Sequence, residues 1–313
     1  MTEASSWLWV VFTLIAAFSQ TFRNLLQKGL TATLGTVGAT HVRFLFGLPC
    51  AILMVGAILW VTPAQRLTWS AEFWVWVWVG GLAQIVATAL MLGAMQMKSF
   101  SIATAYVKSE PVTVALLAFV FLGEPLGVLA VLAIVVATAG VVLMSSPGRA
   151  TAAAPESASS QKPAGLTLGA PIALGLGAGA LFALAAVGFR GAILALGEDP
   201  FFVRAAVTLV VSLAVQTAVL SLWLALRSPG TLMAILKAWR PSLGAGALGS
   251  FASLCWFVAF SLQSPALVRT LALVEILFAM ALARRLFAQR ESVRETWGIV
   301  LMVVGVAALL LTD

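Results

Sequence analysis

The sequence has little charge, two cysteines and a single histidine, and each shortage excludes a class of protein. Only 9% of its 313 residues are Asp, Glu, Lys or Arg, whereas 62% are hydrophobic. An average soluble domain carries about 25% charged residues, so the composition excludes a soluble globular protein, and so apolar a chain is not a disordered one. Both cysteines lie inside apolar runs, so no disulfide framework is predicted.

The shortage of histidine and of clustered acids also argues against catalysis. His41 is the only histidine, so neither a zinc site of the HExxH type nor another metal cluster is predicted. Glu110 and Glu275 have no matching histidine for a Ser–His–Asp triad. We therefore expect no enzyme, no catalytic residue, no metal and no cofactor. The net charge of +7 does not indicate nucleic acid, because the basic residues lie mainly at the ends of apolar runs.

Long apolar runs make up most of the chain. A helix that crosses about 30 Å of hydrocarbon needs roughly 20 residues. Segments of that kind occur ten times with short breaks between them, at 7–28, 40–61, 72–97, 99–122, 126–145, 168–194, 200–226, 239–262, 266–287 and 293–311. The sequence therefore predicts an all-α integral membrane protein with ten transmembrane helices.

One long polar segment divides these helices into two sets of five. Residues 146–165 are rich in Ser, Pro and Ala, a composition typical of a flexible linker. We predict that this linker is cytoplasmic and joins a first repeat at 1–145 to a second at 166–313.

Charged positions recur in the same order in the two halves. Five helices is an odd number, so a second copy enters the membrane from the opposite side and gives an inverted repeat. That architecture is typical of secondary transporters, whose substrate site lies near the midplane. The recurring positions are Glu110 with Glu275, Arg23 with Arg190, and Arg43 with Arg204.

The distribution of Lys and Arg predicts the orientation, since these residues are enriched in cytoplasmic loops. Thirteen of them lie in or beside the loops that follow odd-numbered helices, with Arg23 and Arg43 counted among them, and three lie beside the other loops. This asymmetry predicts that both termini lie on the outer, periplasmic side of a bacterial-type inner membrane.

Four charged residues fall inside the predicted spans, where a charge costs at least about 2.5 kcal/mol at the bilayer centre. Lys108 and Glu110 lie in the fourth span, and Arg269 and Glu275 lie in the ninth. Residues two apart on a helix do not face each other, so Lys108 and Glu110 are not expected to be partners. Lys108 has no charged counterpart in the second half and is predicted to face a cavity, where Lys108 or a helix end would meet a substrate carboxylate. For Glu110, Glu275 and Arg269, a buried ion pair and a role in coupling are both open.

Two helix faces combine polar residues with bulky adaptable ones. Polar groups fix the head of a ligand, whereas Met and aromatic side chains adapt to its body. These faces, on the third and eighth spans, therefore predict a cavity for an amphipathic solute, with ordinary helix packing as the alternative. With polar groups of the first and fourth spans, the predicted lining residues are Gln84, Thr88, Met91, Met95, Ser253, Trp256, Phe260, Gln20, Asn24 and Tyr106.

The segment SEPVTVALLAFVFLGE at 109–124, followed by a helix ending in AGVVLMS, resembles the signature of the EamA family in the drug/metabolite transporter superfamily. The second half repeats it more loosely, with Glu275 and Glu291 in the corresponding places and Ile276 where the first half has Pro111. The resemblance implies an inner-membrane exporter of small metabolites that works by alternating access. Within the family, the layout and aromatic content are most similar to YddG-type exporters of aromatic and neutral amino acids.

These features predict a secondary transporter that exports amino acids or similar small metabolites. The alternative is a multidrug or organic-cation exporter, for which Glu110 or Glu275 would supply an acid facing the cavity. The related small multidrug pumps exchange protons on a glutamate of the first helix, where this chain has Gln20 and Asn24. The expected partners are a small-molecule substrate and the lipid bilayer, with no nucleic acid. The oligomeric state is left open.

Overall fold

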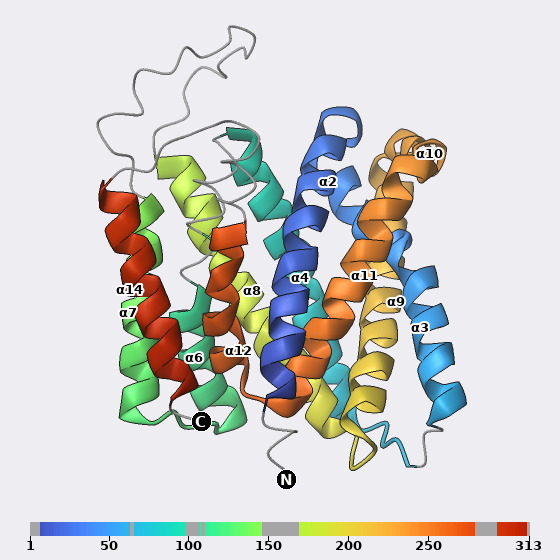
Figure 1. Ribbon diagram of the computed structural model, residues 1–313. Coiled ribbons are helices and arrows are strands. Elements are labelled where there is room, and N and C mark those ends of the chain that lie inside the picture. Colours follow the sequence, from blue (N-terminus) through green and yellow to red (C-terminus); the bar gives the residue numbers. More distant parts are fainter. Residues whose placement is uncertain are drawn as a thin grey trace, which may run out of the picture.

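The computed structural model describes residues 7–62, 66–97, 107, 110–145, 169–278 and 293–311. Every regular element in these ranges is a helix, and the helices run side by side in one bundle (Figure 1). They are α2 (Leu8–Leu45), α3 (Gly47–Val61), α4 (Ala71–Met97), α6 (Glu110–Leu122), α7 (Val128–Ser145), α8 (Gly169–Ala195), α9 (Phe201–Arg227), α10 (Pro229–Lys237), α11 (Trp239–Leu262), α12 (Pro265–Leu271), the 3₁₀ helix η2 (Ala272–Val274) and α14 (Val293–Leu310).

The length and surface of these helices suit a membrane. Five segments are long and apolar enough to cross one, namely Leu8–Val61 and the spans within α4, α8, α9 and α11. Large apolar side chains face outward on them and on the shorter helices, among them Leu53, Trp60, Leu116 and Val128. Exposing so much apolar surface to water is unfavourable, whereas contact with lipid tails is not. Helices occupy part of each of the ten predicted spans, which confirms the predicted fold class.

The first two predicted spans are joined more closely than the sequence suggests. Helix α2 continues past Lys28 to Leu45 and turns back at Gly35, whose φ of 67° lies in the left-handed region. Only glycine adopts that conformation without a steric penalty. The second predicted span therefore begins inside α2 and continues as α3.

The ninth predicted span is broken within the described residues. Ser264 caps α12 by accepting a hydrogen bond from the Leu267 amide, and Pro265 follows at the first turn. After Leu271 the chain tightens into η2 and then resumes as a helix at Glu275. The two charged residues of this span, Arg269 and Glu275, consequently lie on either side of the tight turn.

Helices of the first half pack mainly against helices of the second. Helix α4 packs on α8, α2 on α11, α7 on α14, α6 on α12, and α3 on α9. This pairing is unchanged when each span is exchanged for the span at the same place in the other half, as two repeats related by a two-fold axis require. Helix α2 begins and α14 ends at the same end of the bundle (Figure 1).

The α7–α14 contact is reciprocal at the residue level. A Cβ on Gly140 of α7 would lie 2.5 Å from the Met302 nitrogen, and a Cβ on Gly305 of α14 would lie 2.5 Å from the Ala137 nitrogen. Both distances are far below van der Waals contact, so the two backbones approach only because each glycine lacks a side chain.

Candidate substrate-binding cavity

A cavity lies between the two halves, with walls supplied mainly by α2, α4, α8 and α11. The volume that the centre of a water-sized sphere can occupy inside this cavity is about 30 Å³. On the same measure, one water molecule needs about 10–15 Å³. A solute larger than a few waters therefore requires the walls to move apart. The lining combines charged, amide and aromatic side chains: Gln20, Arg23, Asn24, Arg43, Gln84, Met91, Val107, Glu110, Phe182, Phe189, Ser253, Trp256, Phe257, Phe260, Arg269 and Glu275.

Most of the predicted site residues meet in this cavity. Thr88 and Met95 are buried on α4 but are not among the lining residues, and the Thr88 hydroxyl donates to the Gln84 carbonyl at 2.8 Å. Lys108 and Tyr106 lie outside the described residues, so their roles stay predictions. The predicted residues that do line the cavity are Gln20, Asn24, Gln84, Met91, Glu110, Ser253, Trp256, Phe260, Arg269 and Glu275.

Two arginines in the cavity were not expected there. Arg23 is 1% exposed and Arg43 is 3% exposed, which corrects their assignment to the flanks of cytoplasmic loops. The reason is the course of α2, which carries both residues inside the bundle before and after its turn at Gly35. Without these two arginines, the loops that follow odd-numbered predicted helices still carry more basic residues than the other loops.

A helical spacing in the sequence could have revealed this polar face. Gln20, Arg23, Asn24 and Gln27 follow one another at i, i+3, i+4 and i+7, which places them on one side of a helix. A polar stripe of four residues within an apolar span has to face protein or water. The aromatic residues Phe182, Phe189 and Phe257 were also missed, because an aromatic residue in an apolar span carries no distinguishing signal.

Arg269 is held from two directions. Its Nε lies 3.1 Å from Glu110 Oε1, and this ion pair joins α12 to α6. Its guanidinium also lies over the Trp256 ring, 4.4 Å from the ring centre, and 5.3 Å from the centre of Phe260. All four side chains are at most 9% exposed, so screening by water is weak and the pair is strong.

Gln20 connects the aromatic wall to the second glutamate. The Trp256 indole donates to Gln20 Oε1 at 3.0 Å, and Gln20 Nε2 donates to Glu275 Oε2 at 3.2 Å. The two bonds fix which end of the Gln20 amide faces which partner. On the opposite wall, Gln216 of α9 donates to Gln84 Oε1 at 2.8 Å, so the amides of Gln20 and Gln84 are each oriented by neighbours.

The remaining arginines contact uncharged groups. Arg43 Nη2 donates to the Ser253 hydroxyl at 3.1 Å, and Arg23 Nη2 donates to Asn24 Oδ1 at 2.6 Å. The described lining thus holds three guanidinium groups and two carboxylates. Beside them lies a wall of four phenylalanine rings and the Trp256 indole, all on α8 and α11. This arrangement suits a solute with an anionic group and an apolar body.

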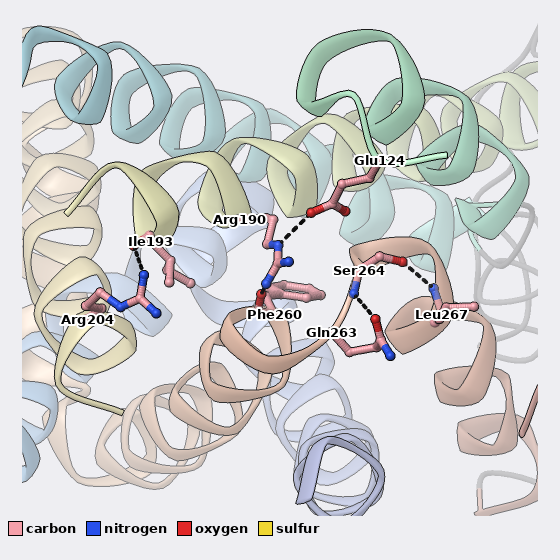
Figure 2. A network of polar contacts seen from close by, with 8 residues as sticks. All are labelled: Glu124, Arg190, Ile193, Arg204, Phe260, Gln263, Ser264 and Leu267. Atoms are coloured by element: carbon pink, nitrogen blue, oxygen red, sulfur yellow. Dashed lines mark hydrogen bonds and ion pairs between the residues drawn. The ribbon is translucent and has the colours of Figure 1, made fainter. Parts of the chain in front are cut away.

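A polar network lies where α6, α8 and α11 end (Figure 2). Arg190 of α8 pairs with Glu124, its Nε lying 3.0 Å from Oε1, and its Nη1 donates to the carbonyl of Phe260, a residue that also lines the cavity. Arg204 donates to the Gly197 carbonyl at 2.9 Å. One arginine thereby joins the end of α6 to the floor of the cavity.

Comparisons with known proteins agree with this architecture. Solved structures match in 26 chains, among them one titled "Crystal structure of protein" with a TM-score of 0.66 and 15% identity, covering 98% of this chain and 96% of that one. At this identity the likeness shows the fold alone. A search of the curated proteins finds no match. The model of the EamA-like transporter family matches residues 7–146 of this chain, which contain the first five predicted spans.

Proposed function

We propose that this transporter exports amino acids with neutral or aromatic side chains, or similar small amphipathic metabolites, across the inner membrane by alternating access. The observation that carries the proposal is that guanidinium and amide groups face the same cavity as an aromatic wall. An amino acid presents a carboxylate, an ammonium and a side chain, and this lining offers a complementary group to each.

The arrangement of the helices also supports alternating access. The polar groups lie mainly on the α2–α11 pair, whereas the opposite wall comes from the α4–α8 pair, and each pair combines one helix from each half. Movement of one pair against the other would open the narrow cavity to either side in turn. A substrate promotes that cycle only if it binds the inward and outward states differently.

The charges favour an amino acid over an organic cation. A cation exporter needs an acid facing the cavity beside aromatic rings. Among the described lining residues, arginines outnumber glutamates, and Glu110 is already paired with Arg269. Arg269 itself occupies the face of Trp256, where a cationic solute would otherwise bind.

Counterflow in proteoliposomes tests the proposal. Vesicles loaded with one unlabelled amino acid at a time should accumulate radiolabelled phenylalanine when the internal amino acid is a substrate, and tetraphenylphosphonium should not compete. Loss of counterflow for every amino acid, with uptake of the lipophilic cation, would instead establish the cation exporter.

A matched pair of variants localises the activity. Trp256→Ala removes the ring that lies over Arg269 and donates to Gln20. We expect at least a tenfold loss of phenylalanine counterflow, since truncating a buried aromatic anchor of a binding site costs about 2 kcal/mol or more of binding free energy. Trp223→Ala is the control, because Trp223 of α9 is 46% exposed on the outer surface. Equal effects of both changes would argue against a role of this cavity in transport.

A further inference from the structure

The two arginines of α2 keep buried hydrogen-bond donors that have no partner among the described residues. Arg23 Nε and Nη1 and Arg43 Nε are buried and make no hydrogen bond within the part of the chain that the structure describes. Neither guanidinium forms an ion pair with a described residue, in contrast to Arg269 and Arg190. An unsatisfied buried donor costs about 1–3 kcal/mol, and more when it is charged, so an anion at these atoms would relieve a substantial penalty.

The two side chains are brought together by one glycine. A Cβ on Gly249 of α11 would lie 3.2 Å from Arg43 Cγ and 3.3 Å from Arg23 Cδ, so both stems pass over the same point of that helix. Ser253, one turn further along α11, holds the head group of Arg43. Two like charges close together and away from water repel each other strongly, and a shared anion is the group that reverses this repulsion.

The third arginine of the cavity is already engaged. Arg269 has Glu110 as its counter-ion and two aromatic rings as neighbours. The charge of Arg269 is therefore compensated by a direct ion pair. The Glu275 charge acts on Arg23, but neither Arg23 nor Arg43 forms an ion pair with a described residue, so their guanidinium groups are the more available ones among the described lining residues.

We propose that Arg23 and Arg43, packed over Gly249, form a two-arginine site that binds the carboxylate of the transported solute. The inference rests on the proposed function, because it names the groups of the same cavity that hold the head of the substrate. Guanidinium groups present paired N–H donors that match a carboxylate in a bidentate manner. With the carboxylate there, the apolar body of the solute would lie against the phenylalanine rings of α8 and α11 that line the same cavity.

Binding to the purified full-length protein tests the site, with phenylalanine, 3-phenylpropanoate and phenethylamine as probes. The second probe lacks the ammonium and the third lacks the carboxylate. We expect phenylalanine and 3-phenylpropanoate to raise the thermal unfolding temperature and phenethylamine to leave it unchanged. Binding of phenethylamine alone would overturn the two-arginine site. Binding of 3-phenylpropanoate without phenylalanine would reject the amino acid as substrate and leave the site intact.

Variants assign the binding to the named residues. Arg23→Gln and Arg43→Gln should each weaken 3-phenylpropanoate binding at least about tenfold, the loss expected for one charge-assisted hydrogen bond. Lysine at either position keeps the charge but not the planar fork, so binding should be recovered only in part. Arg240→Gln is the control, since Arg240 is exposed and outside the cavity. Full affinity in both glutamine variants would contradict the proposal.

Gly249→Ala probes the site without touching the guanidinium groups. The added methyl would displace the two stems, so 3-phenylpropanoate affinity should fall severalfold while the protein elutes as the same folded species in size-exclusion chromatography. If the arginine variants fail to fold, this variant decides the question on its own: unchanged affinity would overturn the role of the arginine pair. Phenyl phosphate, used as a further probe, shows whether the site prefers a carboxylate or accepts any oxyanion.

Discussion

Arg269 shows how a charge is kept inside a membrane protein at tolerable cost. It has a carboxylate on one side and two aromatic rings on the other, so its charge is neutralised and its planar face is covered. Removing one member of such a pair leaves the other buried and uncompensated, whereas removing both does not. The pair is therefore expected to behave as a unit.

Glu110→Gln should lower the free energy of unfolding by about 3–5 kcal/mol, the usual cost of breaking a buried pair. The double variant Glu110→Gln with Arg269→Met removes both charges and should be more stable than Glu110→Gln alone. Thermal unfolding in detergent, followed by intrinsic tryptophan fluorescence, compares the three proteins. Additive losses in the double variant would show that the two residues act independently.

At the residue scale, sequence reasoning found much of the cavity and missed Arg23 and Arg43. The stripe on α4 and its counterpart on α11 contributed Gln84, Met91 and Trp256 because helical spacing places such residues on one face. Arg23 and Arg43 were misassigned because counting basic residues treats an arginine near a predicted helix end as a loop residue. Helix α2 in fact continues past Arg23 and turns only at Gly35, and a count of basic residues contains no information about where a helix turns.

At the scale of elements, the apolar runs predicted the helices well and their interruptions poorly. Length and hydropathy locate a span, but they do not distinguish an α-helical turn from the tighter 3₁₀ turn of η2. The merger of α2 with the start of the second span and the short helix α10 were unexpected for the same reason. Local backbone geometry is decided there by single residues and by packing.

The α7–α14 contact gives a prediction at this scale. Gly140→Ala places a methyl group 2.5 Å from a backbone nitrogen of α14, and overpacking of this kind costs about 1–3 kcal/mol. We expect a clear drop in the thermal unfolding temperature. Gly56→Ala is the matched control, because nothing lies within 4 Å of its added Cβ and alanine favours a helix by up to about 1 kcal/mol over glycine. A similar drop in both proteins would contradict the role of close packing.

The Arg190 network predicts how access to the cavity is restricted. Glu124→Gln weakens the tie between the end of α6 and the carbonyl of Phe260, so the cavity should open more often toward that end. In a protein without Cys50 and Cys255, a cysteine at Ser253 reports access by its rate of labelling with a membrane-impermeant maleimide.

We expect faster labelling from the side of the chain termini in the Glu124→Gln background. Glu72→Gln serves as the control, since Glu72 is exposed at the start of α4 and bonds only to Trp76 among the described residues. Labelling rates that do not differ between the two backgrounds would show that the network is no barrier.

At the scale of the whole molecule, the two halves were predicted from a few charged positions, and the helix pairing agrees with that organisation. Exchanging the halves leaves every major helix pair unchanged. The reciprocal glycines Gly140 and Gly305 also occupy equivalent places in the last span of each half. Packing across the two-fold axis could not be predicted from the sequence, because it depends on contacts between residues more than a hundred positions apart.

The orientation of the molecule in the membrane is a prediction of the basic-residue asymmetry. Alkaline phosphatase fused after Asp313 should be active, because this enzyme folds only in the periplasm. A green fluorescent protein fused at the same position should remain dark, because it does not fold when it is exported to the periplasm in an unfolded state. The reverse pattern would place both termini in the cytoplasm.

The pairing of α2 with α11 has a consequence for the synthesis of the protein. Chains are made from the N-terminus, and early segments fold before late ones exist. Helix α2, with Arg23 and Arg43, therefore enters the bilayer long before the ribosome has produced Gly249, over which both arginine stems pass, and Ser253, which Arg43 contacts. Until α11 has been made, the two arginine charges lie in the bilayer without these contacts, and insertion scales put the free-energy cost at a few kcal/mol for each charge. If the first half were made alone, this free-energy cost would remain after insertion. The two halves therefore depend on each other for biogenesis as well as for the cavity between them.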